Sequence, residues 1–232
     1  MKDIAQDIAD TIMERPVGFD VDGRHFSLYP PSLGALYMMQ RLTAKMGLKP
    51  RAMAVNPFAE CLRLAGMRRE ECLALVACAT LRGREALTDT GAVRKRTEEL
   101  GRLTKEELAK TLLLALTSER SAERMERLGI RRDRERMRQV LRAKKDSDSY
   151  SFGCVSIYGS LLDAACERYG WTLDYVVWGI SYENLRLMLA DKPDTVYLTR
   201  EERRRCHVPN KAAADGNNAD QMREMMRQIT GR

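Results

Sequence analysis

The amino-acid sequence predicts a mainly α-helical protein with one β-hairpin near its N-terminus. Three observations support this fold class. Apolar residues recur at helical spacing along most of the 232 residues, and Asp22-Gly23 separates two short runs in which apolar and polar residues alternate. Capping boxes, in which a Thr is followed three residues later by a Glu, begin at Thr104 and Thr199.

The first two predicted elements are an amphipathic helix at residues 3–14 and a hairpin within residues 17–30. Ile residues spaced four apart form one face of the helix, and Pro16 follows it. Asp-Gly supplies the positive φ angles that a type I′ turn requires. The apolar residues that alternate on either side of this turn are Phe19, Val21, Phe26 and Leu28.

Helices are predicted over most of residues 32–81. Ser32 is a suitable N-cap for the first of them, and Gly47 ends it. A second helix covers about 53–64, where Pro57 marks either a start or a kink. The strongest pattern is at residues 68–81, with a single inward face made of Cys72, Leu75, Val76 and Ala79.

The middle of the chain is more polar. Residues 82–101 mix apolar and polar residues without a clear period, and Asp89-Thr90-Gly91 indicates a break. A helix follows the Thr104 capping box. Residues 118–145 are highly charged and are interpreted as one or two helices. The polar, turn-rich segment at 146–153 is the best internal boundary.

Four regions follow from these patterns: a hairpin-plus-helix domain at 1–145, a linker at 146–153, a helical unit at 154–206 and a flexible tail at 207–232. In the third region a helix is predicted over residues 155–168, with Gly170 after it. Thr172 and Ser181 are placed as caps of two further short helices.

The stretch 169–205 concentrates the large aromatic side chains, including both tryptophans. It is interpreted as a helical corner that serves either as a core or as a partner-binding surface. On general frequencies tryptophans are core residues, although aromatic residues are also enriched at interfaces. The hypothesis of partner binding applies to Trp171, Tyr175, Trp178, Tyr182 and Leu185.

The net charge is +7, with basic residues concentrated at 131–145 and 200–205. A solvated amphipathic helix is the preferred interpretation of 131–145, and a helix that contacts phosphates is the alternative. The second helix of the 169–190 corner lacks the exposed polar donors of a groove-reading helix. Nucleic acid is therefore not the favoured partner.

The six cysteines form no CxxC pair, and most lie in apolar helical patterns, so they are expected to be free thiols acting as small hydrophobic side chains. No zinc site is expected. No apolar run is long enough to span a bilayer, and acids stand where a signal peptide would be basic. These features predict a cytoplasmic protein without membrane contact.

The sequence contains no phosphate-binding loop, dinucleotide fingerprint, HExxH or GxSxG motif. Its two histidines, His25 and His207, have no supporting nucleophile or carboxylate pattern beside them. The acidic residues are distributed among Arg and Lys on helix faces, where solvated pairing is expected. We therefore expect no enzyme activity, no catalytic or metal-binding residues, and no cofactor.

Two segments and the charged helical middle resemble bacteriophage tail assembly chaperones, of the kind encoded by phages and prophages of Bacteroides-like hosts. The first segment is FDVDGRHFSLYPPSLGALYMMQRL, at residues 19–42. The second is WTLDYVVWGISYENLRLMLADKPDTVYLTREERRR, at residues 171–205. The resemblance covers both ends of the chain and is weak across residues 50–150.

The resemblance implies a non-enzymatic chaperone that keeps the tape measure protein soluble in the host cytoplasm and helps to bring the major tail protein to it. Such a protein is absent from the mature virion, and self-association is left open. The alternatives are a basic helical nucleic-acid-binding accessory or regulatory protein and a structural tail protein. Steep salt dependence would identify the first of these alternatives, and presence in purified virions the second.

Overall fold

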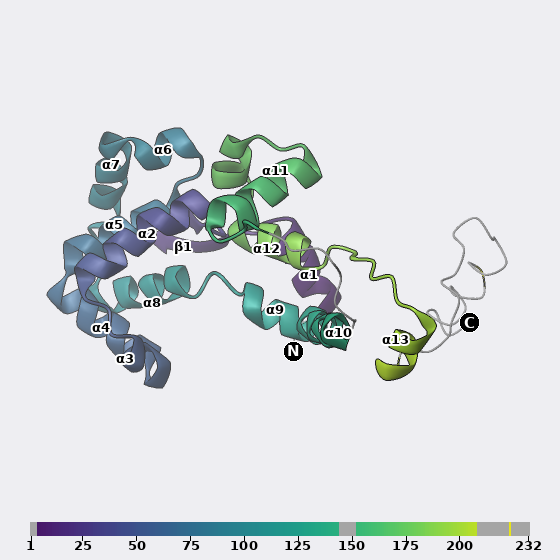
Figure 1. Cartoon of the computed structure of the whole chain (residues 1–232). Helices are drawn as coiled ribbons and strands as arrows, with labels where there is room; N and C mark the ends of the chain where they lie inside the picture. Colours follow the sequence, from purple (N-terminus) through teal and green to yellow (C-terminus); the bar gives the residue numbers. More distant parts are fainter. Residues whose placement is uncertain (1–3, 144–151, 208–222, 224–232) are drawn as a thin grey trace. The chain divides into compact units, whose positions relative to one another are not determined.

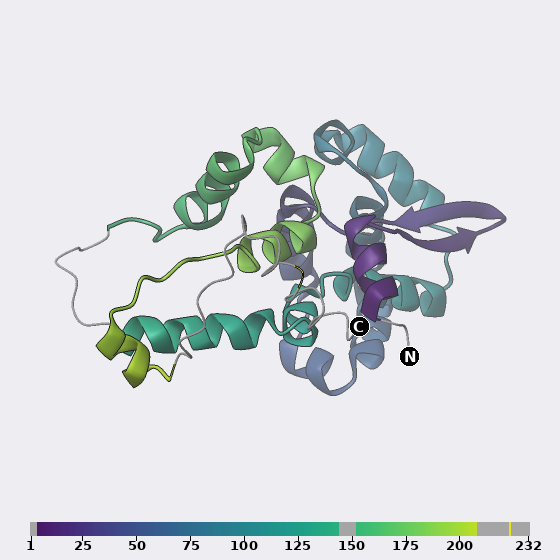
Figure 2. The same ribbon diagram turned by 90° about the vertical axis from the view of Figure 1, so that its right-hand side faces the viewer.

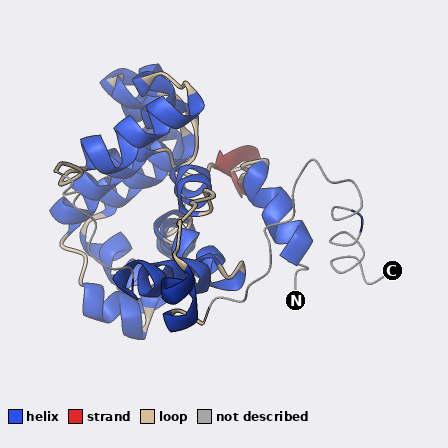
Figure 3. Ribbon diagram, turned by 45° about the vertical axis from the view of Figure 1, so that its right-hand side comes forward, coloured by secondary structure: helices blue, strands red, loops and turns tan. Residues whose placement is uncertain are grey.

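The computed structural model describes residues 4–143, 152–207 and 223. Helices make up most of this described part, and its one sheet is a two-stranded antiparallel hairpin (Figure 3). The predicted fold class, mainly α with an N-terminal hairpin, is confirmed. Among the described helices, none combines the length and apolar character needed to cross a membrane.

The chain forms two compact units. The first contains Met1–Ile130 and Phe152–Lys192, and the second contains Arg131–Ser151 and Pro193–Arg232. The elements of the first unit are α1 (Ile4–Ile12), β1 (Val17–Val21), β2 (Arg24–Leu28), α2 (Leu33–Met46), α3 (Pro50–Val55), α4 (Pro57–Met67), α5 (Arg69–Thr80), α6 (Arg84–Thr88), α7 (Thr90–Leu100), α8 (Lys105–Leu116), α9 (Ser121–Arg127), η1 (Tyr158–Asp163), α11 (Ala164–Tyr169), η2 (Tyr175–Gly179) and α12 (Tyr182–Ala190).

This division differs from the predicted regions 1–145 and 154–206. Residues 152–192 group with 1–130 because α12 packs on α1 and α9, while η2 packs on α2. The predicted linker at 146–153 lies mostly outside the described residues, as does all of the predicted tail except His207 and Arg223.

The hairpin forms at the predicted turn. Asp22 and Gly23 have φ angles of 52° and 75°, and Val21 pairs with Arg24 across them. The turn end of the hairpin extends away from the helices that hold its base (Figure 2). Tyr29, just beyond β2, donates its backbone N–H to the Ala79 carbonyl over 3.0 Å, which attaches the hairpin to α5.

Local capping signals position α2 and α4. Ser32 accepts the Ala35 N–H at 3.3 Å, and Gly47 ends α2 in the left-handed conformation. Pro57 begins α4 rather than kinking a longer helix, and Asn56 caps it by accepting the Ala59 N–H at 3.0 Å. The segment predicted as one helix is therefore two, α3 and α4.

Helix α5 is the centre of the larger core and packs against α2, α4, α7 and α8 (Figure 1). The sequence predicted one inward face, but every residue from Cys72 to Thr80 except Ala74 is buried. Neighbours on several sides explain the difference, since a helix that is apolar around its circumference is a buried helix.

Residues 82–101, for which only mixed character was predicted, form α6 and α7. The predicted break at Asp89 is present, because the Asp89 carboxylate accepts the Gly91 N–H at 2.8 Å and caps α7. Few apolar residues fall on these helices, which is why their helical pattern is weak. Leu87 and Leu100 are nevertheless fully buried.

A second apolar cluster joins η1, α11, η2 and α12 to the start of α2. Its buried members are Leu33, Leu162, Ala165, Val176, Ile180 and Leu185. Two predicted helices, 155–168 and the short one after Thr172, contain π-helical turns. In the second of these the Ile180 N–H donates to the Tyr175 carbonyl five residues earlier at 3.2 Å.

In the second unit the described helices are α10 (Ile130–Ala143), which begins at the last residue of the first unit, and α13 (Arg200–Arg205). The Thr199 capping box is formed: the Thr199 N–H donates to Glu202 at 2.8 Å, and the Glu202 N–H donates to the Thr199 hydroxyl at 3.3 Å. After α13, Cys206 Sγ approaches the Val140 carbonyl of α10 at 3.9 Å.

Candidate functional site

The five residues of the partner-binding hypothesis occupy different environments. Leu185 is fully buried in the second apolar cluster, and Trp171, Trp178 and Tyr182 are half-buried. Only Tyr175 is exposed, with 45% of its surface accessible. The large side chains of this stretch therefore occupy both core and surface positions.

Trp178 is a packing residue between η2 and α2. Its ring lies directly over Gly34, where an added Cβ would come within 2.4 Å of two ring carbons. The space beside this contact is about 20 Å³, which holds roughly one water molecule. Trp178 therefore fixes the corner and does not line a ligand-sized pocket.

Trp171 and Tyr175 belong to an aromatic cluster at the surface. The Trp171 ring stacks on Tyr169 with centroids 4.6 Å apart and meets Tyr175 edge-on at 5.2 Å. Leu173 beside them is 54% exposed. We call Tyr169, Trp171, Leu173 and Tyr175 the aromatic cluster.

Tyr182 lines an apolar groove of about 420 Å³ formed by α2, the end of α8 and α12. The floor is Leu33 and Met39, both buried, and Leu36 and Tyr37 stand beside it. The other lining residues are the buried Ala115, the half-buried Leu116 and the polar Gln40, Thr43, Ser118 and Glu119. This feature is called the α2–α12 groove below.

The α2 side of the groove was not among the predicted site residues, although the sequence contains a signal for it. The helical spacing of α2 predicts an inward stripe of Ala35, Met39, Leu42 and Met46; Leu42 is half-buried and the other three are buried. Leu33, Leu36 and Tyr37 form a second stripe at i, i+3 and i+4 on the same helix. Leu33 of this second stripe is buried in the second apolar cluster, whereas Leu36 is half-buried and Tyr37 is exposed, so the stripe is only partly covered.

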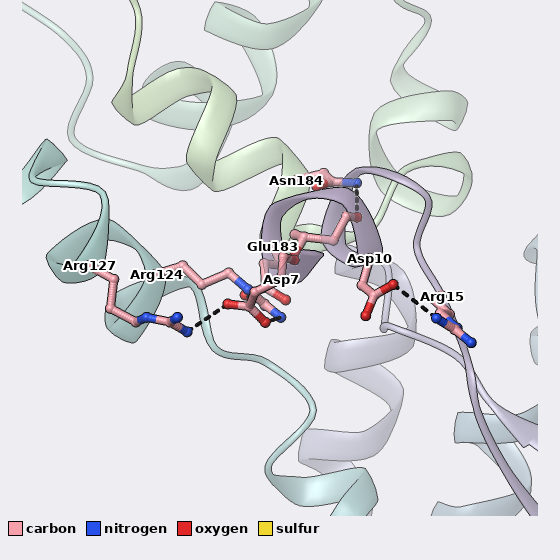
Figure 4. A network of polar contacts seen from close by, with 8 residues as sticks. Asp7, Asp10, Arg15, Arg124, Arg127, Glu183 and Asn184 are labelled. Atoms are coloured by element: carbon pink, nitrogen blue, oxygen red, sulfur yellow. Dashed lines mark hydrogen bonds and ion pairs between the residues drawn. The ribbon is translucent and has the colours of Figure 1, made fainter. Parts of the chain in front are cut away.

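A network of ion pairs holds α12, and with it Tyr182, against α1 and α9 (Figure 4). Arg124 of α9 binds Glu183 of α12 and contacts Asp7 of α1 at 3.4 Å. Arg127 adds a second bond to Asp7 at 2.7 Å. The Glu183 side chain is only 6% exposed, so burial raises its pKa, and the hydrogen bond from Arg124 opposes that rise.

A second set of contacts attaches the start of α12 to the segment after α1. Glu14, which has a positive φ of 51°, accepts the Ser181 N–H at 2.6 Å and also pairs with Arg82. The Asn184 side-chain amide donates to the Thr11 carbonyl at 3.0 Å. No local pattern could predict these contacts, because the partners are far apart in the sequence.

Backbone contacts bring α12 to the start of α2. Ser32 and Ser181 form an isolated antiparallel bridge, and the Tyr182 N–H donates to the Pro31 carbonyl at 2.8 Å. Consequently Leu33 and Tyr182, although 149 positions apart by their numbers, lie on the same groove.

The acids of the ion-pair network are engaged in structural pairs. The network borders a cleft of about 470 Å³, where its acids pair with Arg15, Arg124 and Arg127. Elsewhere, burial raises the thiol pKa of Cys72 to about 12 and of Cys61 and Cys78 to about 11, so these thiols stay protonated at neutral pH. Within the described residues, no group of three or more His, Cys, Asp or Glu side chains could hold a metal ion.

No family model matches this chain, and no match was found among curated proteins or solved structures. The fold and site define a mainly α-helical protein whose surface features are an apolar groove and an aromatic cluster, with ion pairs that fix the groove's third helix.

Proposed function

We propose that this protein is a non-enzymatic phage tail assembly chaperone that holds apolar helical segments of the tape measure protein in its α2–α12 groove. One observation carries the proposal. The two segments that resemble tail assembly chaperones, 19–42 and 171–205, meet through the Pro31–Tyr182 hydrogen bond, and both contribute residues to the lining of the groove.

The groove has the chemistry that an amphipathic client helix requires. Such a helix binds by placing its apolar side chains in a groove between helices, with anchors at i, i+3, i+4 and i+7. Leu33 and Met39 offer an apolar floor with Leu36 beside it, and the Met39 side chain adapts to irregular surfaces. Gln40, Thr43 and Glu119 lie at the polar margin, where the solvated face of the client helix would be.

The aromatic cluster extends the proposed contact surface. Tyr175 and Leu173 are exposed, and tyrosine and tryptophan contribute large contact areas at protein interfaces. In this proposal the chaperone acts in the host cytoplasm, assists addition of the major tail protein and leaves before the virion matures.

Co-expression with a tape measure fragment tests the proposal. Wild-type protein should keep the fragment soluble and co-purify with it. Leu36→Ala combined with Tyr182→Ala removes apolar surface from the groove, so co-purification should fall several-fold. Met67→Ala combined with Val55→Ala is the matched control, because both side chains are exposed and apolar and neither lines the groove.

Helical circular dichroism of every variant must match that of the wild type for the comparison to count. If wild-type protein leaves the fragment insoluble, the proposed function is wrong. If the fragment is soluble but the groove and control pairs reduce co-purification equally, the client binds elsewhere.

A further inference from the structure

The second unit contains a strongly basic surface hollow that the proposed chaperone function does not use. Helix α10 carries six arginines and two acids, a net charge of +4 over 14 residues. A hollow of about 530 Å³ lies beside it. It is lined by Arg132, Glu135, Arg136, Gln139 and Val140 of α10 and by Arg205, Cys206 and His207 at the end of α13.

From this geometry we infer that the α10–α13 hollow binds the phosphate backbone of nucleic acid. Arg132 and Arg136 are four residues apart, about 6 Å along the helix axis, and lie on the same face. Arg205 and His207 approach from the end of α13. Cationic side chains from two segments therefore converge on one volume.

The positive charges of the two lining arginines of α10 are not neutralised by acids within the described residues. Both Arg132 and Arg136 are exposed, and within the described residues neither forms an ion pair with an acid. Arg205 has a single loose pair with Glu201 at 3.7 Å, in which both side chains are well exposed. Pairs of this kind are weak, so an incoming phosphate would compete for Arg205 at low cost.

The chemistry of the lining favours phosphate over other anions. A guanidinium presents a planar fork of donors that binds two phosphate oxygens at once. Gln139 adds an amide donor, and Glu135 carries the one carboxylate among the described lining residues. A phosphate backbone presents successive phosphates to the three arginines of the lining, Arg132, Arg136 and Arg205.

The basic run at 131–145 was interpreted from the sequence as a solvated amphipathic helix. The structure adds what the sequence could not show, which is that the Arg205–His207 segment lies on the same hollow as the Arg132 face. Leu141, an apolar residue of α10, is 47% exposed. This inference is independent of the proposed chaperone function.

The test is fluorescence anisotropy with a short labelled DNA duplex and the matching single strand, using the full chain. Wild-type affinity should fall steeply between about 50 and 200 mM salt, because bound cations release counterions from the phosphates. Arg132→Gln with Arg136→Gln should weaken duplex binding about tenfold and reduce the slope of log K against log salt by about two. Gln is a good helix former, so α10 should keep its helicity.

Two further variants make the result specific. Arg41→Gln with Arg51→Gln removes the same charge from exposed positions in the first unit and should leave affinity within about twofold. Glu135→Gln removes the opposing carboxylate and should tighten binding several-fold. Tape measure co-purification should be unchanged in the Arg132/Arg136 variant, which separates this inference from the chaperone proposal.

Three results would overturn the inference. The first is that the wild-type protein does not bind the duplex. The second is that the Arg132/Arg136 and Arg41/Arg51 variants lose affinity equally, which would mean that binding depends only on the net charge of the protein. The third is displacement of the duplex by polyglutamate at equal charge concentration, which would identify an acidic protein as the better ligand.

Discussion

At the scale of single residues, Gly34 sets how closely η2 approaches α2. An alanine Cβ at this position would meet the Trp178 ring at 2.4 Å, and that ring is packed rather than free to swing. Gly34→Ala should therefore destabilise the protein by about 1–3 kcal/mol through overpacking.

Gly66→Ala is the matched control for this prediction. Gly66 lies on the exposed surface of α4, and its new Cβ would meet only the flexible end of Lys105 at 3.0 Å. Alanine should here stabilise by about 0.5–1 kcal/mol, because glycine is a poor helix former. Urea unfolding measures both, and a Gly34→Ala protein as stable as Gly66→Ala would contradict the packing role of Trp178.

The buried carboxylate of Glu60 should make the stability of the protein depend on pH. Its buried carboxylate accepts two hydrogen bonds from Arg63, at 2.6 and 2.7 Å, and one from the Lys49 N–H at 2.9 Å. The bonds from Arg63 are the main reason that its pKa falls from 4.5 to about 2, against the opposing effect of burial. Because the folded pKa is depressed, this stabilisation is present above pH about 4.5 and is lost as the pH falls toward 2.

Glu60→Gln should cost about 2 kcal/mol at neutral pH, since it removes a buried charge-assisted network. The difference from wild type in the free energy of unfolding should shrink as the pH falls from about 6 to about 3. Glu106→Gln, at an exposed position on α8, should show little difference at either pH. A Glu60→Gln deficit that is constant with pH would exclude the ionised carboxylate as its source.

At the scale of elements, Arg124 is the central residue of the ion-pair network that joins α12 to α1 and α9. Its guanidinium is 15% exposed and pairs with the buried Glu183, whereas Arg127 is 37% exposed. Arg124→Met should cost about 3–5 kcal/mol, because it leaves a buried carboxylate without its partner. Arg127→Met should cost at most about 1 kcal/mol.

A double-mutant cycle checks this assignment. Adding Glu183→Gln to Arg124→Met removes the orphaned charge and should recover part of the lost stability. Chemical denaturation of the four proteins gives the coupling energy. Additive effects of the two substitutions would mean that Arg124 and Glu183 do not stabilise each other in solution.

The elements also show which parts of the structure the sequence could predict. The hairpin turn, the Ser32 and Ser181 caps and both capping boxes were predicted correctly, because each is determined by residues within about four positions of one another. The Arg124–Glu183–Asp7 network was not predicted, since its members lie on α9, α12 and α1. Its pairing depends on the packing of those helices.

The candidate site shows the same limit. Aromatic concentration directed the partner-binding hypothesis to residues 171–185, but composition alone could not separate the buried Leu185 from the exposed Tyr175. Nor could it reveal that Tyr182 would share a groove with Leu33 and Leu36, because that depends on the Ser32–Ser181 bridge.

At the scale of the whole molecule, the first unit is assembled from two separated parts of the chain, 1–130 and 152–192. The later part contributes most of the second apolar cluster, including Leu162, Val176 and Leu185. It also supplies Glu183, without which Arg124 would be a largely buried cation with only Asp7 as a partner. The stability of residues 1–130 should therefore depend on residues 152–192.

Two truncated proteins test this dependence. Residues 1–192 retain both parts of the first unit, whereas residues 1–145 retain only the first part together with the whole of α10. The shorter protein lacks α12, η2 and most of the second apolar cluster, so it should unfold at a lower urea concentration. Its m value should also be smaller, because m scales with the surface exposed on unfolding. It should also expose Leu33 and the surface at Gly34 on which the Trp178 ring packs. It should therefore bind hydrophobic dyes more strongly. If 1–145 matches 1–192 in unfolding midpoint, then 1–145 is an independent domain, and α12 is an attached element rather than part of the first unit's core.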